Sequence, residues 1–176
     1  MVTFTLQHKS WESLARLYAG LTRSFRDLKS GKGWKLFEEK YGVVASIRGS
    51  EVTWGEDSGW HPHFHVVFFL DQTGEKLDRD YKDAFVARIA KMYGDKVSKN
   101  GFYVSPEYGV KVSFDQDHVS AYAAKWGMDQ ELAKSPAKIA KSDHYSPFQI
   151  LLESAKGLEQ KEKFDRLFMI YAAAMK

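Results

Sequence analysis

Apolar and polar residues alternate in several segments of the chain, and this pattern predicts β-strands. Residues 2–8 alternate and are rich in β-branched side chains, and residues 43–54 and 60–70 also indicate extended segments. The connection over residues 55–59 is rich in turn formers, so these last two strands should form an antiparallel hairpin. Residues 108–114 alternate again and predict a fourth strand.

Apolar residues at helical spacing predict the elements between the strands. Ser10 can cap a first helix that runs to about Leu28 and carries Trp11 on its apolar stripe. Asp78 is one of two candidate caps for a second helix, and Gly94 is expected to break the chain after it.

The C-terminal part of the chain is predicted to be helical. Residues 117–134 predict a third helix, Ser146-Pro147 starts a short helix over residues 148–154, and residues 157–175 predict a last one. The last helix has no capping residue, which is consistent with truncation at the C-terminus. The element order β-α-β-β-α-β predicts an α+β fold, with an antiparallel sheet of ferredoxin-like or RRM-like layout, two helices on one face and additional C-terminal helices. We expect a single domain over residues 1–176.

The composition narrows the class of protein. Of the 176 residues, 44% are hydrophobic and 28% are charged, which is typical of a globular protein with a sizeable core. No apolar run approaches the ~20 residues of a membrane span, so we expect no membrane partner. The absence of cysteine excludes disulfides and thiol chemistry and fits a cytoplasmic protein. The net charge of +3 is too small to indicate a nucleic-acid partner by itself.

Three of the six histidines, His61, His63 and His65, stand at alternate positions directly before an apolar run. Alternate side chains of a strand share a face, so these imidazoles can converge at the edge of a core. We expect Glu51 to pair with His65 across the hairpin, which places Glu51 on the imidazole face. Two imidazoles and a carboxylate predict a divalent-metal site that still admits a substrate. The alternative is a set of core histidines whose hydrogen bonds are satisfied within the protein.

The predicted third helix carries a second group of polar residues on one face. His118, Tyr122 and Lys125 fall together at helical spacing, so Tyr122 and Lys125 are neighbours. The alternative for Tyr122 is a tyrosine that packs its ring, and for Lys125 a solvated side chain.

Basic residues gather in two segments, each of which can contact nucleic-acid phosphates or form a solvated helix face. One segment covers the first helix and the loop after it, and the other follows the third helix. The residues are Arg23, Arg26, Lys29, Lys32, Lys35, Lys134, Lys138 and Lys141.

Several of these segments together resemble the HUH endonuclease family. His63-Phe64-His65 resembles the metal-binding motif of that family, and Tyr122-Ala123-Ala124-Lys125 resembles its Tyr-x-x-Lys nucleophile motif. Residues 3–8 are similar to the first strand motif, and residues 48–53 to the segment that supplies the acidic ligand. The order of the motifs, together with residues 146–152, is similar to that in replication initiators of bacterial rolling-circle plasmids.

The resemblance implies the HUH endonuclease fold and a metal-dependent enzyme. Such an enzyme nicks and joins single-stranded DNA, sequence-specifically, at a plasmid replication origin. Mn²⁺ or Mg²⁺ would be held by Glu51, His63 and His65. His61 would hydrogen-bond a ligand or the phosphate. Tyr122 would attack the scissile phosphate, forming a 5′-phosphotyrosine and releasing a 3′-OH.

The resemblance also implies supporting residues and partners. Lys125 would favour the phenolate or stabilise charge in the transition state. Some related initiators carry a carboxylate one turn before the tyrosine, where this chain has His118; a neutral imidazole can act as the general base of the terminating step. A host helicase and a host polymerase are the expected partners.

Two other functions fit part of the pattern. Residues 61–67 nearly match the motif of histidine-triad nucleotide hydrolases, which use a histidine nucleophile and no metal, although Pro62 occupies an apolar slot. The second alternative is an origin-binding module that holds DNA without cutting it. Sensitivity to a chelator tests the first alternative, and Tyr122→Phe tests the second.

Overall fold

The computed structural model describes residues 1–71, 77–115, 144–157 and 160–176. Within these ranges the strands are β1 (Val2–Thr5), β2 (Val43–Gly55), β3 (Gly59–Leu70), β4 (Val110–Val112) and β5 (His144–Tyr145). The helices are α1 (Leu14–Leu28), α2 (Lys32–Tyr41), α3 (Arg79–Lys99), α6 (Pro147–Ala155) and α7 (Lys161–Ala174). The helix predicted over residues 117–134 lies outside the described residues.

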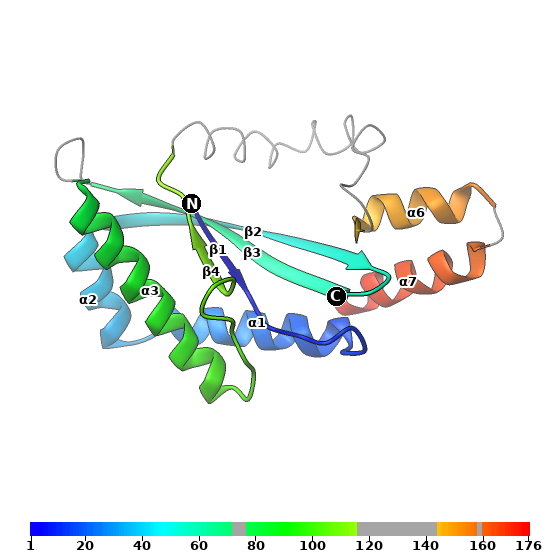
Figure 1. Ribbon diagram of the computed structural model, residues 1–176, viewed down its shortest axis with the longest axis horizontal. Helices are drawn as coiled ribbons and strands as arrows, with labels where there is room; N and C mark the ends of the chain where they lie inside the picture. The colour runs from blue at the N-terminus through cyan, green and yellow to red at the C-terminus, as the bar shows by residue number, and fades with distance from the viewer. Residues whose placement is uncertain (72–76, 116–143, 158–159) are drawn as a thin grey trace.

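The described strands form one antiparallel sheet in the order β4-β1-β3-β2-β5. The long hairpin of β2 and β3 is its centre, and the short strands β4 and β5 are its edges. Figure 1 shows α1, α2 and α3 on one side of the sheet, and α6 and α7 near the turn of the hairpin. The predicted α+β architecture with an antiparallel sheet is therefore confirmed, with α2 and β5 added and with β1 and β4 shorter than predicted.

The hairpin of β2 and β3 has a different register from the predicted one. Glu51 pairs with His63 rather than with His65, whose partner is Gly49. The predicted pairing was therefore wrong by two residues. Because side chains alternate with a period of two, Glu51 still lies on the imidazole face.

The tight turn of the hairpin sets this register. The strands remain paired as far as Gly55 and Gly59, so only residues 56–58 form the connection. Gly59 has a φ of 71°, in the left-handed region that closes a three-residue hairpin loop. A Cβ at Gly59 would lie 2.2 Å from the carbonyl oxygen of Ser10, so this position also requires close backbone approach.

The core lies between the sheet and the helices that cover one of its faces. Phe64 and Val66 on β3 have no exposed surface, and the ring centroid of Phe64 lies 5.6 Å from that of Phe25 on α1. Helix α2 adds Trp34 and Phe37 to the same cluster. Full burial of each such side chain contributes roughly 1.5–3 kcal/mol to stability. The even-numbered residues of β3 thus hold the sheet to the helices.

Helix α1 begins later than the sequence predicted. Ser13, rather than Ser10, accepts a hydrogen bond from the backbone N–H of Arg16 and caps the helix. Trp11 therefore precedes the helix, and 76% of its surface is exposed. Its predicted place on an apolar stripe was wrong.

Two further predictions are corrected by α2 and α3. Lys32 and Lys35, predicted to lie in a loop, belong to α2, because Gly31 at a φ of 82° turns the chain directly into this helix. Gly94, predicted to break the chain, lies inside α3. Burial of the apolar side of α3 outweighs the roughly 1 kcal/mol that an internal glycine costs. Asp78 caps α3, as one of the two candidates predicted.

The short helix α6 begins at Pro147, directly after its N-cap Ser146, as the sequence predicted. The Ser146 side chain accepts from the backbone N–H of Gln149, and the Gln149 side chain accepts from the backbone N–H of Ser146. Helices α6 and α7 pack with the start of α1 against Val52 and Trp60 near the turn of the hairpin. None of the described helices is long and apolar enough to cross a membrane.

Candidate metal centre

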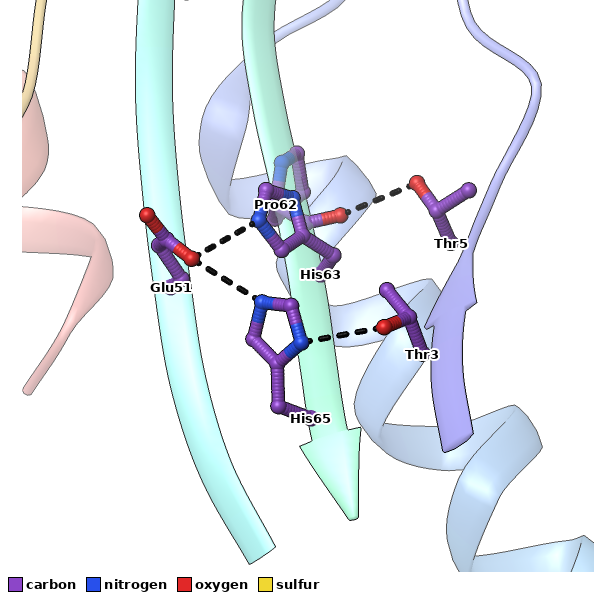
Figure 2. Close-up of polar contacts among 6 residues, drawn as sticks. All are labelled: Thr3, Thr5, Glu51, Pro62, His63 and His65. Carbon is purple, nitrogen blue, oxygen red and sulfur yellow. Dashed lines mark hydrogen bonds and ion pairs between the residues drawn. The ribbon is translucent and has the colours of Figure 1, made fainter. Parts of the chain in front are cut away.

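The odd-numbered residues of β3 lie on the face of the sheet opposite the core, and Glu51 of β2 lies beside them. His63 Nε2 and His65 Nε2 lie 3.2 Å and 2.9 Å from one atom, Glu51 Oε2. Figure 2 shows both imidazoles pointing at this carboxylate from the neighbouring strand. The ligand atoms of the three side chains all lie within 4.8 Å of one another.

Strand β1 supports this group from the other side of β3. Thr3 pairs with His65 in the sheet, and its Oγ1 lies 3.0 Å from His65 Nδ1 (Figure 2). When His65 Nδ1 carries the hydrogen and donates it to Thr3, the lone pair of Nε2 is directed at the Glu51 side. Thr5 instead donates to the carbonyl oxygen of Pro62 at 3.3 Å, which ties β1 to β3.

The chemistry of these donors fits a divalent cation. Two imidazole nitrogens and one carboxylate oxygen form the kind of mixed set that binds first-row divalent metals and leaves coordination positions open. The His63 and His65 side chains are only 16% and 11% exposed, whereas Glu51 is 47% exposed. The two imidazoles are therefore mostly covered, and the carboxylate is the most exposed of the three donors. Glu51, His63 and His65 could hold a metal ion.

His61 stands two positions before His63 and hydrogen-bonds another imidazole. Its Nδ1 contacts His8 Nε2, at the end of the segment that follows β1. The pKa of His61 is lowered to about 4, first by burial and then by the nearby imidazoles of His8, His63 and His144. Burial also lowers the pKa of His8. Both rings are therefore neutral near pH 7, so one can donate to the other.

An open cleft of about 580 Å³ lies next to His63 and extends towards β4. Strand β1 contributes Thr3 and Thr5 to its lining, and the chain around β4 contributes Tyr108 and Lys111. A volume of this size is typical of sites that bind small molecules or cofactors. A ligand in the cleft would lie beside the cluster of Glu51, His63 and His65, which we call the imidazole group.

The structure describes none of the residues predicted for catalysis or for the second basic segment. They lie outside the described residues and are His118, Tyr122, Lys125, Lys134, Lys138 and Lys141.

The structure does not bring the first basic segment to the imidazole group. Arg23 and Arg26 lie on α1, which packs against the opposite face of the sheet, and Lys29 is the C-cap of this helix. Lys32 and Lys35 lie on α2. Lys29 Nζ donates to Ser46 Oγ at 2.7 Å and lies over the ring of Trp34. All five predicted side chains are exposed. Contact with a nucleic acid there stays a prediction.

Sequence reasoning assigned no role to Thr3 and His8, although the structure places both beside the predicted histidines. The alternation of residues 2–8 correctly predicts a strand start with Thr3 on one face. The missing information was the pairing of β1 with β3, which joins segments about sixty residues apart.

Comparison with known proteins gives two distant relatives. The chain is 24% identical over 206 residues to "Protein rep" of Streptomyces lividans, an alignment that covers 86% of this chain and 44% of that protein. It is 31% identical over 94 residues to the "Neomycin resistance protein" of Streptomyces cyanogenus, which covers 40% of this chain and 22% of that protein. The chain spans less than half the length of these curated relatives. No protein-family model matches, and no solved structure matches.

Proposed function

We propose that this chain is the nicking domain of a plasmid replication initiator of the HUH endonuclease type. It cuts and rejoins single-stranded DNA at a replication origin through a covalent bond between Tyr122 and a 5′-phosphate. The observation that carries the proposal is the convergence of Glu51, His63 and His65 beside an open cleft. The similarity to "Protein rep" of Streptomyces lividans supports a role in plasmid replication.

A divalent cation, Mn²⁺ or Mg²⁺, fits the donor set of Glu51, His63 and His65. When bound, it supplies positive charge to the oxygens of the scissile phosphate. The protein's own part is to present the donors in fixed positions. Thr3 holds the His65 ring through Nδ1, and β2 and β3 hold Glu51 opposite His63. The neutral His61–His8 pair adds no positive charge beside the site.

Tyr122 and Lys125, which lie outside the described residues, are the proposed reacting pair. A phenol has a pKa of ~10, so Tyr122 must lose its proton to attack efficiently, and a neighbouring ammonium favours the phenolate. The Tyr122 oxygen forms a bond to phosphorus while the bond from phosphorus to the 3′ oxygen breaks. The leaving 3′ oxygen takes up a proton and becomes the 3′-OH end.

The end of the reaction requires a second transfer from the phosphotyrosine, either to an incoming 3′-OH or to water. His118 is the proposed general base for this step. We propose that the basic residues predicted from the sequence contact DNA phosphates away from the reacting bond. A host polymerase would extend the new 3′-OH, and a host helicase would unwind the duplex ahead of it.

The test is the formation of a protein–DNA adduct. Wild-type protein incubated with random-sequence single-stranded oligonucleotides and Mn²⁺ should give a covalent species on denaturing gels, and EDTA should prevent it. Tyr122→Phe keeps the ring but removes the attacking oxygen, so it should bind DNA and form no adduct. Mass spectrometry should find the nucleotide on Tyr122 and not on Tyr103 or Tyr108.

Two results would reject the proposal in favour of its rivals. Nucleotide hydrolysis that persists in EDTA and in Tyr122→Phe would indicate histidine-triad chemistry. Binding of single-stranded DNA by the wild-type protein without any adduct would indicate a module that binds without cutting.

A further inference from the structure

Three aromatic side chains with large exposed surfaces line two clefts, one of which lies beside His63. The exposed fractions are 77% for Tyr103, 76% for Trp11 and 57% for Tyr108. The chain between α3 and β4 carries the two tyrosines and is bound to the end of β1. There the Tyr103 carbonyl accepts from the Gln7 N–H at 2.9 Å, and the Gly109 carbonyl accepts from the Thr5 N–H at 3.0 Å. Single exposed aromatics are common on protein surfaces, whereas a series beside a candidate active site is informative.

Two adjoining clefts connect these rings to the imidazole group. The cleft of about 580 Å³ beside His63 is also lined by Tyr108. A second cleft of about 540 Å³ is lined by Tyr103 and Trp11. Gln7 lines both clefts, so they meet at this residue, at the end of the segment that follows β1. Each volume is within the range of sites that bind a ligand of nucleotide size.

Cationic side chains accompany the rings. Lys111 Nζ lies 5.3 Å from the ring centroid of Tyr108, and Lys9 Nζ lies 4.9 Å from that of Trp11. Lys111 pairs with Thr3 across β1 and β4, so it lies on the face that carries the imidazole group. Alternating aromatic rings and cations are the combination that binds bases by stacking and phosphates by charge.

The acidic residue in the second cleft is already neutralised. Glu12 pairs with Arg16, which also lines this cleft, and it accepts from the backbone N–H of Lys9 at 2.9 Å. An approaching phosphate therefore meets the charge of Lys9 without an unpaired carboxylate beside it.

The chain that carries the two tyrosines is held in shape before any ligand binds. The Ser105 side chain accepts from the backbone N–H groups of Glu107 and Tyr108, and its carbonyl accepts from the Gly109 N–H at 2.8 Å. A Cβ at Gly109 would lie 1.8 Å from a methyl group of Val104, so the turn closes only with glycine there. A preformed surface loses little conformational entropy on binding.

We propose that single-stranded DNA runs from the imidazole group across β1 and β4, with successive bases against Tyr108, Tyr103 and Trp11. Lys111 and Lys9 contact the phosphates between these bases. The partner is single-stranded rather than duplex DNA because bases within a duplex are already stacked on each other and cannot lie on protein rings. This inference rests on the proposed function and adds the direction and the contacts of the bound strand.

Fluorescence anisotropy with a labelled oligo(dT) of about 20 nucleotides, in EDTA so that no DNA is cut, measures the binding alone. Trp11→Ala and Tyr103→Ala should each weaken affinity by about fivefold or more, the effect of losing one stacked base. Tyr103→Phe keeps the ring face and should bind as the wild type does. Met169→Ala removes a 69% exposed side chain from α7, away from the clefts, and is the matched control.

A second readout identifies the contact directly. Photo-cross-linking with an oligo(dT) that contains 5-iododeoxyuridine should label Trp11, Tyr103 or Tyr108. Thermal unfolding should be unchanged in the alanine variants, because both side chains are mostly solvated.

The results that overturn this inference differ from those that overturn the proposed function. If Trp11→Ala and Tyr103→Ala bind oligo(dT) as tightly as Met169→Ala does, the path across β4 is wrong, even where the Tyr122 adduct forms. If unlabelled duplex DNA displaces the labelled oligo(dT) as well as unlabelled oligo(dT) does, the inference is also overturned. If the wild-type protein binds no oligo(dT) at low salt, the proposed function falls together with the path.

Discussion

On β3, neighbouring residues have opposite surroundings. Phe64 has no exposed surface and packs against Phe25 of α1, whereas His63 and His65 on either side of it face Glu51. The only structural difference is which way each side chain points from the strand. One face of β3 supplies burial energy, and the other holds nitrogen atoms at defined distances from a carboxylate. We therefore expect substitutions on the two faces to affect different measurements.

The largest effect on stability is expected from Phe64→Ala. It removes a fully buried ring that also contacts Tyr18, and such truncations cost about 3–5 kcal/mol. Urea denaturation in EDTA measures the change in the free energy of unfolding. Phe69→Ala, on the same strand but with 45% of its surface exposed, should cost about 1 kcal/mol or less. Equal losses of stability in the two variants would mean that the two faces of β3 contribute equally to folding.

His63→Ala should show the reverse behaviour. It removes one of the donor atoms near Glu51 Oε2, so Mn²⁺ affinity should fall by about tenfold or more and adduct formation should stop. Its free energy of unfolding in EDTA should change far less than that of Phe64→Ala. Calorimetric titration with Mn²⁺ is the measurement, and His144→Ala, whose ring contacts Ser58, is the control. Normal cleavage by His63→Ala in Mn²⁺ would show that the site is assigned to the wrong residues.

Thr3→Val tests the orientation of His65 separately, because it leaves every metal donor in place. The substitution keeps the shape of the side chain but removes the oxygen that meets His65 Nδ1. Loss of such an orienting hydrogen bond typically weakens metal affinity by about tenfold. Thr5→Val is the matched control on the same strand. Thr5 stands opposite a donor residue, His63, just as Thr3 stands opposite His65, but its hydroxyl donates to the backbone carbonyl of Pro62. Similar Mn²⁺ affinities for the two variants would mean that Thr3 does not position His65.

Acid should destabilise the protein partly through the imidazole face. Because the pKa of His61 is about 4 in the folded protein and about 6.5 in an unfolded chain, the unfolded chain binds more protons between these values. The free energy of unfolding should therefore fall as the pH falls through this window, and His8 acts in the same direction. Urea denaturation in EDTA at about pH 7.5 and about pH 4.5 measures this fall in the free energy of unfolding. The difference between the wild type and His61→Gln gives the contribution of His61. A steeper loss in His61→Gln than in the wild type would contradict the expectation.

The sequence predicted which face of the hairpin carries the imidazole group, but it did not predict which residues stand opposite each other. The alternation of His61, His63 and His65 is visible in any register. The register depends on how far the strands stay paired into the turn, and here they remain paired to Gly59. An error of two residues keeps every side chain on its face, so Glu51 still lies beside His63 and His65.

Other features depend on contacts that no local pattern contains. Trp11 has helical spacing from the apolar stripe of α1, yet the cap at Ser13 leaves it in solvent. Thr3 joins the site because β1 pairs with β3. These strands lie about sixty residues apart in the chain, and no local sequence pattern predicts that they are neighbours. The apolar residues of α2, such as Trp34 and Phe37, have helical spacing, so that helix could have been predicted.

The position of the donor residues along the chain has a consequence for folding. Glu51 lies 12 and 14 positions before His63 and His65, so one hairpin turn brings all three together. Thr3 is 62 positions from His65 and meets it only when β1 joins the sheet. Short loops close at low entropic cost and local contacts form fastest. During folding, the three donors should therefore assemble before the hydroxyl that orients one of them, so a cation present at that time would bind a nascent hairpin whose His65 ring is still free to turn.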